Sequence, residues 1–170
     1  MDAAKTGILV IGFGNPGRLD DGLGPALASR IEGMNLPNVT VDSDYQLTVE
    51  DAAEVARHDV VVFADADVGG PEPFYVRRLR PSGGTLSFST HSVTPAAVLT
   101  LARELFRSEP QGFLLGIRGY EFNEFGERLS ERAVENLEAA ATYLAAALRT
   151  GRIEEIRADG DLPRGGSAKS

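Results

Sequence analysis

Two kinds of apolar pattern alternate along this chain, and each predicts a different element of secondary structure. Continuous apolar runs predict buried strands at residues 8–11 and at residues 59–66, where consecutive apolar residues leave no polar position facing outward. Residues 39–41 and 112–117 are further strand candidates. Residues 74–79 lie beside several prolines, which favours an edge strand, with its direction left open.

Apolar residues spaced three or four positions apart predict helices between these strands. The helices begin near residues with capping or first-turn preferences, namely Pro25, Thr48, Thr94 and Ser130. The last helix is the longest, and its alanine- and leucine-rich face reaches Leu148. Strands that alternate with helices predict an α/β protein with an open, mainly parallel sheet and helices on both faces.

The length and composition of the chain fit a single globular domain. The chain has 170 residues, of which 42% are hydrophobic and 25% charged, enough for a full hydrophobic core. We assign residues 1–149 to this domain. From residue 150 the sequence is polar, with glycine, proline and mixed charge, which predicts a disordered tail over residues 150–170.

Charge and cysteine content exclude several classes of function. A net charge of −8 argues against nucleic acid or an anionic membrane as a partner. The chain has no cysteine, which excludes disulfides, thiolate zinc sites and cysteine nucleophiles. The sequence has no signal-peptide pattern and no apolar run of membrane-spanning length, so we expect a cytoplasmic protein.

The loop after the first predicted strand contains a glycine pattern that invites a nucleotide-binding interpretation. Gly12, Gly14 and Gly17 match the G-x-G-x-x-G fingerprint of dinucleotide sites. In those sites a helix begins directly after the glycines and its N-terminus binds a pyrophosphate. Here the loop continues to Asp20 and Asp21, whose carboxylates would repel an anion. The loop therefore favours a cation or a positively polarised substrate.

Acidic side chains follow several of the predicted strands, at the edge of the sheet where α/β proteins bind ligands. These side chains, with one histidine before the Thr94 helix and two polar residues after the last strand, are Asp20, Asp21, Asp42, Asp44, Asp65, Asp67, His91, Asn123 and Glu124. Two carboxylates and an imidazole suit a divalent metal such as nickel or zinc. The same groups would also suit activation of a water molecule for hydrolysis.

Simpler interpretations of the same residues stay open at this point. Asp20 or Asp21 would cap the first helix equally well, and aspartates such as Asp65 are common in turns at strand ends. His91 lies in a polar stretch and fits a surface histidine. His58 follows a predicted helix and fits a cation at a helix C-terminus.

The combined pattern resembles the [NiFe]-hydrogenase maturation proteases. The resemblance rests on residues 12–16 (GFGNP) and 20–24 (DDGLG), on Asp65 within the segment FADA, and on His91 ahead of a predicted helix, and it covers roughly residues 7–148. It implies a three-layer α/β/α sandwich, phosphorylase/hydrolase-like, with a mainly parallel, mixed five-stranded sheet. It also implies an endopeptidase that removes a C-terminal extension from a hydrogenase large-subunit precursor after nickel insertion.

The resemblance also implies roles for individual residues. Asp21, Asp65 and His91 match the positions that contact nickel, which belongs to the substrate, so no permanently bound cofactor is required. Asp44 matches an acid that acts as a general base or positions water, which makes the four residues the candidate catalytic set of an aspartyl-type protease. Where much of the family has a Gly-Thr segment, this chain has residues 45–48 (YQLT), as in the branch that serves cytoplasmic, cofactor-coupled hydrogenases.

Three hypotheses from different functional classes follow. The first is the maturation endopeptidase, which we expect to act as a monomer on the large-subunit precursor. The second is a nickel-dependent assembly factor or chaperone that uses the same cleft without cleaving its partner. The third, which the two aspartates disfavour, is a dinucleotide-binding oxidoreductase.

Overall fold

The computed structural model describes residues 7–81 and 93–157, which fold around one five-stranded sheet. The strand order is β2-β1-β3-β5-β4. Neighbouring strands run parallel except β4, which runs antiparallel to β5 and so settles the direction of the predicted edge strand. The strands are β1 (Ile8–Phe13), β2 (Val39–Asp44), β3 (Val60–Asp67), β4 (Phe74–Leu79) and β5 (Gln111–Arg118).

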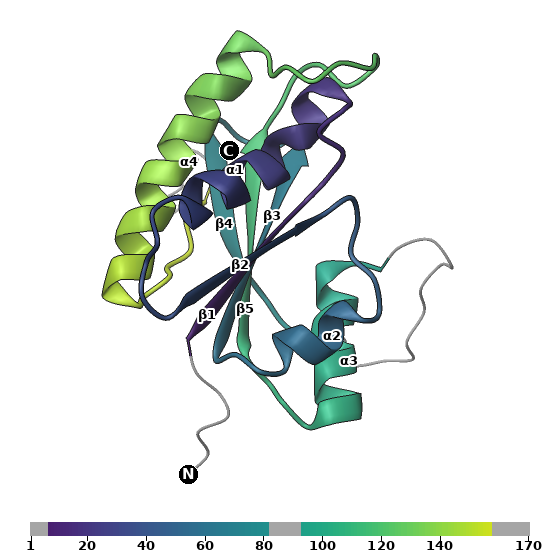
Figure 1. Ribbon diagram of the computed structural model, residues 1–170, viewed down its shortest axis with the longest axis vertical. Helices are drawn as coiled ribbons and strands as arrows, with labels where there is room; N and C mark the ends of the chain where they lie inside the picture. The colour runs from purple at the N-terminus through teal and green to yellow at the C-terminus, as the bar shows by residue number, and fades with distance from the viewer. Residues whose placement is uncertain (1–6, 82–92, 158–170) are drawn as a thin grey trace.

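Helices cover both faces of the sheet (Figure 1), which confirms the predicted three-layer α/β fold. One face packs against α1 (Leu23–Glu32) and α4 (Glu131–Thr150), and the other against α2 (Asp51–Val55) and α3 (Pro95–Phe106). Each face has its own apolar core. Because β1 and β3 are covered on both faces, their sequences are continuous apolar runs, as parallel central strands require.

The predicted helix starts are confirmed at three positions, including Pro25 in the first turn of α1, and corrected at the fourth. The Thr94 hydroxyl accepts a hydrogen bond from the N–H of Ala97, and Ser130 caps α4. Thr48 is not the cap of α2, because that helix begins at Asp51 and Glu50 precedes it. Instead the Asp51 carboxylate accepts the backbone N–H of Thr48 at 2.8 Å, so the side chain inside the helix makes the bond.

The chain leaves α4 at Gly151, whose φ of +78° ends the helix, and then runs along the outer edge of the sheet. Ile156 and Val76 exchange both backbone hydrogen bonds, at 2.8 and 2.9 Å. Residues 158–170 lie outside the described residues, so the predicted disorder of the tail stays a prediction for them. Within the described ranges, no helix has both the length and the apolar character needed to cross a membrane.

Candidate functional site

The register of the sheet brings Asp44 and Asp65 to opposite sides of the end of β1. Asp44, the last residue of β2, is in register with Phe13, and Asp65 follows Ala64, which is in register with Gly12. Side chains alternate along a strand, and Phe63 packs in the core beneath α2 and α3. Asp65 therefore points to the face of the sheet that these helices cover.

A tightly built loop after β1 presents Asp21 at the same edge. The Asp21 carboxylate accepts the N–H of Asn15 at 2.8 Å, and the N–H of Gly14 is bound by the backbone carbonyl of Asp44 at 3.0 Å. Gly14 has a φ of +143°, and a Cβ there would lie 2.2 Å from the carbonyl oxygen of Asp21. The loop therefore needs glycine at this position to place Asp21.

Gly12, the first glycine of the apparent dinucleotide fingerprint, and Gly24, in the first turn of α1, allow close packing. A Cβ on Gly12 would lie 2.1 Å from the carbonyl oxygen of Gly24, and one on Gly24 would lie 2.5 Å from that of Phe13. The first turn of α1 thus packs directly on β1. A short 3-10 helix, η1 (Leu19–Gly22), separates the loop from α1, so α1 does not begin at the glycines as a pyrophosphate site requires.

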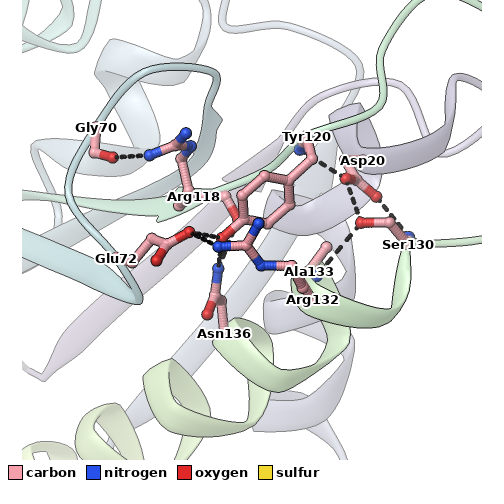
Figure 2. A network of polar contacts seen from close by, with 9 residues as sticks. All are labelled: Asp20, Gly70, Glu72, Arg118, Tyr120, Ser130, Arg132, Ala133 and Asn136. Carbon is pink, nitrogen blue, oxygen red and sulfur yellow. Dashed lines mark hydrogen bonds and ion pairs between the residues drawn. The ribbon is translucent and has the colours of Figure 1, made fainter.

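Asp20 has a structural role that the sequence did not reveal (Figure 2). Its side chain is fully buried and accepts hydrogen bonds from the N–H groups of Tyr120, Glu121 and Ser130 and from the Ser130 hydroxyl, at 2.7–3.0 Å. Burial by itself would raise the pKa of Asp20, but these hydrogen bonds outweigh it and the pKa is lowered. Asp20 thus joins η1 to the start of α4, and neither it nor Asp21 caps α1, which Gly22 precedes.

The connection between β5 and α4 is fixed by a further set of polar contacts around Tyr120 (Figure 2). The Tyr120 hydroxyl donates to the Glu72 carboxylate and accepts from the side-chain amide of Asn136 at 2.8 Å. The guanidinium groups of Arg118 and Arg132 lie 5.0 and 4.4 Å from the centre of the Tyr120 ring. These contacts tie the β3–β4 loop to the start of α4.

The surroundings of Asp65 raise its pKa, whereas those of Asp20 lower the pKa of Asp20. Burial, followed by the negative charges of Asp21 and Asp67, raises the pKa of Asp65 to about 7, and the N–H of Ala66, at 2.8 Å, only partly offsets these effects. The influence of Asp21 on this pKa means that the two carboxylates are close enough to interact. A cation between them would relieve the cost of holding both charges.

Tyr75 and Asp67 form one wall beside Asp65. Gly116 is in register with both Asp65 and Tyr75, and a Cβ on Gly116 would lie 2.4 Å from atoms of the Tyr75 ring. The ring therefore lies flat over Gly116 on the side where Asp65 points. Burial and then the hydrogen bond to Asp67, at 2.8 Å, raise the pKa of Tyr75 to about 12, which keeps its hydroxyl protonated.

Asp67 is held in its charged form by its surroundings. Burial opposes ionisation, but hydrogen bonds from the N–H of Gly69 and the Tyr75 hydroxyl, with the charge of Arg118, lower its pKa. Asp67 was predicted among the acids of this edge, whereas Tyr75 was not. The signal that could have found Tyr75 is Gly116, a glycine inside a strand, where a large neighbouring side chain has room to lie.

The four predicted site residues are thus only partly brought together by the described structure. Asp21 and Asp65 interact, and Asp44 lies at the same edge with an exposed carboxylate that accepts the N–H of Tyr45 at 2.8 Å. His91 lies outside the described residues. Among residues 7–81 and 93–157, no group of three or more His, Cys, Asp or Glu side chains is arranged to hold a metal ion.

Comparison with known proteins adds a structural likeness. No family model and no curated protein sequence matches the chain. Among solved structures, the [NiFe]-hydrogenase maturation protease HycI from Thermococcus kodakarensis KOD1 superimposes with a TM-score of 0.67 and 25% identity over 86% of this chain and 95% of that one. The hydrogenase maturating endopeptidase HybD from E. coli gives 0.65 and 24%, over 88% and 96% of the two chains.

A third structure, the hydrogenase 2 maturation peptidase from Thaumarchaeota archaeon SCGC_AB-539-E09, gives a TM-score of 0.60 and 22% identity over 84% of this chain and 97% of that one. Each of the three is a protease or peptidase of hydrogenase maturation by name, and each is matched over nearly its whole length. The resemblance expected from the sequence is confirmed at the level of the fold.

Proposed function

We propose that this chain, which has the fold of the hydrogenase maturation proteases, is an endopeptidase that cleaves the C-terminal extension of a [NiFe]-hydrogenase large-subunit precursor after nickel insertion. The observation that carries the proposal is the pair Asp21 and Asp65 at the carboxyl edge of the sheet. The raised pKa of Asp65 reflects its burial first and then the negative charges of Asp21 and Asp67. A site of this kind favours a cation that arrives with the substrate.

In this proposal, Asp21 and Asp65 contact the nickel of the precursor, and His91 supplies a third ligand from the segment before α3. The protein then checks that nickel is present before cleavage. Carboxylate and imidazole ligands suit nickel, and a site completed by substrate groups needs no metal of its own. Nickel is therefore part of the substrate and not a resident cofactor.

Asp44 is the candidate that positions or deprotonates the attacking water. Its carboxylate is exposed at the same edge, two strands from Asp65. The water would lose a proton to the carboxylate as its oxygen attacks the scissile carbonyl. The peptide C–N bond then breaks, and the leaving amine takes up a proton. We propose that this reaction takes place in the cytoplasm, with the protein acting as a monomer.

The test is a cleavage assay with purified protein and a large-subunit precursor, prepared with and without nickel. We expect a fall in precursor mass, equal to the C-terminal extension, only in the nickel-loaded sample. Asp65→Ala should abolish cleavage. Asp59→Asn, at the opposite edge of the sheet, is the matched control and should cleave like the unmodified protein.

Two outcomes would contradict the proposal. Cleavage by the Asp65→Ala protein at the normal rate would remove Asp65 from the site. Nickel-dependent binding without any change in precursor mass would show an assembly factor in place of a protease.

A further inference from the structure

Phe125 is an aromatic side chain left almost entirely in solvent beside the candidate site. It is 81% exposed and lies on the loop between β5 and α4. Three of the other large exposed apolar side chains among the described residues also lie on loops at the carboxyl edge of the sheet. They are Tyr45, Val49 and Val68. Exposed apolar groups that gather around a site indicate a contact surface for another molecule.

The loop that carries Phe125 is fixed to the loop that carries Asp21. The N–H of Gly126 donates to the carbonyl of Gly17 at 2.8 Å, and the N–H of Leu19 donates to the carbonyl of Gly126 at 2.9 Å. The Arg18 guanidinium lies 5.3 Å from the centre of the Phe125 ring and donates to the carbonyl of Phe122 at 3.3 Å. An aromatic side chain held in place in this way loses little freedom when it is buried by a partner.

The charge around this edge identifies the chemistry of the partner. The four loops at the carboxyl edge, residues 14–22, 45–50, 68–73 and 119–129, contain many acids, and their only basic residues are Arg18 and Arg128. Asp20 is buried and Glu72 pairs with Arg132, so the acids that give this surface its charge are Asp21, Glu50, Glu121, Glu124 and Glu127. Arg18 keeps its positive charge while it contacts the Phe125 ring, and the exposed acids still outnumber the two basic residues. A surface of this charge favours a partner whose contact face is basic.

We propose that Phe125 is the anchor of a docking surface for a folded protein, the large-subunit precursor, which offers an apolar pocket surrounded by basic side chains. Tyr45, Val49 and Val68 form the rim of this surface. The inference rests on the proposed function, because that function supplies a protein substrate. Buried aromatic anchors with a polar surround are the usual centres of binding energy in protein interfaces.

The experiment measures KM and kcat for cleavage of the nickel-loaded precursor. Phe125→Ala should raise KM by about tenfold or more and leave kcat unchanged, because it removes binding energy and leaves the site intact. Phe125→Tyr keeps the ring and should restore KM to within about threefold of the unmodified protein. Raising the salt concentration from about 50 to about 500 mM should raise the KM of the unmodified protein.

The matched control is Phe106→Ala, since Phe106 is also an exposed phenylalanine (48%) but lies at the end of α3, at the opposite edge of the sheet. This control should leave KM unchanged. Equal KM values for Phe125→Ala and the unmodified protein would overturn the inference while leaving the proposed protease in place. If the unmodified protein does not cleave, the affinity of each variant for the same precursor is measured by titration instead. Weaker binding by Phe125→Ala than by Phe106→Ala supports the docking surface, and equal or undetectable binding overturns it.

Discussion

Asp20 and Asp65 lie at the same edge of the sheet, yet their pKa values are shifted in opposite directions. Asp20 is fully buried and accepts four hydrogen bonds, so burial does not prevent its ionisation and its pKa is lowered. Burial, followed by the charges of two other acids, raises the pKa of Asp65 to about 7, because the single hydrogen bond from the N–H of Ala66 does not outweigh these effects. Two carboxylates of one site region thus serve different purposes.

The difference indicates which carboxylate stabilises the fold and which is reserved for a ligand. A carboxylate whose hydrogen bonds are satisfied within the chain has little to gain from a cation. A carboxylate that is partly buried beside like charges is strongly stabilised when a cation binds to it. The ionised form of Asp65 is therefore unfavourable in the free protein. The hydrogen bonds of Asp20 stabilise the loop region next to it.

The largest effect on the stability of the protein is expected from Asp20→Ala. The substitution leaves three backbone N–H groups and the Ser130 hydroxyl without their acceptor, which should cost about 3 to 5 kcal/mol of the free energy of unfolding. Urea unfolding followed by circular dichroism measures it. A loss below about 1 kcal/mol would mean that Asp20 does not join η1 to α4 as described.

Asp65→Asn should change the free energy of unfolding in the opposite direction and by a smaller amount. The pKa of Asp65 is about 7 in the folded protein against an ordinary value of 3.8, so the folded state holds the proton more tightly than the unfolded state. The cost of burying the charge is therefore absent below about pH 4, grows with pH, and is complete above about pH 7. Asp65→Asn removes it and should stabilise the protein at about pH 8 by on the order of 2 kcal/mol, while abolishing cleavage.

Urea unfolding of the Asp65→Asn and unmodified proteins at about pH 4 and about pH 8 checks this prediction. The gain should shrink at the lower pH, where the Asp65 carboxyl is neutral in the folded protein. A gain of the same size at both pH values would show that it does not come from charge.

The smallest effect on stability is expected from Tyr75→Phe, which keeps the aromatic ring over Gly116 and removes only the hydroxyl. Loss of the hydrogen bond to Asp67 should cost about 1 kcal/mol. Because the ring still shields Asp65, the carboxyl of Asp65 should still titrate near pH 7 when followed by NMR. Tyr143→Phe is the matched control, since it removes a tyrosine hydroxyl bound to the carbonyl of Glu154, away from Asp65. A fall in the pKa of Asp65 toward 3.8 in Tyr75→Phe would show that the hydroxyl and not the ring shields it.

Much of the fold could be predicted from the sequence because its signals are local. The apolar run that became β3 and the Thr94–Pro95 start of α3 depend on residues close together in the chain. The position of Asp21 and Asp65 at one edge follows from the rule that parallel strands end on the same side of a sheet.

What the sequence could not reveal depends on residues far apart in the chain. The donors to Asp20 lie 100 to 110 positions away, so no local pattern distinguishes it from its neighbour Asp21. The placement of the Tyr75 ring over Gly116, next to Asp65, requires the register of β3, β5 and β4, which only tertiary packing sets. His91, the remaining predicted ligand, lies outside the described residues.

The pairing of Ile156 with Val76 bears on how the protein behaves at high concentration. An edge strand offers unpaired N–H and C=O groups that can recruit the strand of a second molecule and begin aggregation. Here both backbone groups of Val76 are bound by Ile156, and the Glu155 carboxylate accepts the N–H of Arg78 at 2.8 Å. The residues after α4 thus shield one side of the sheet from self-association, and they contribute to the solubility of the protein while Ile153 and Ile156 pack against its core.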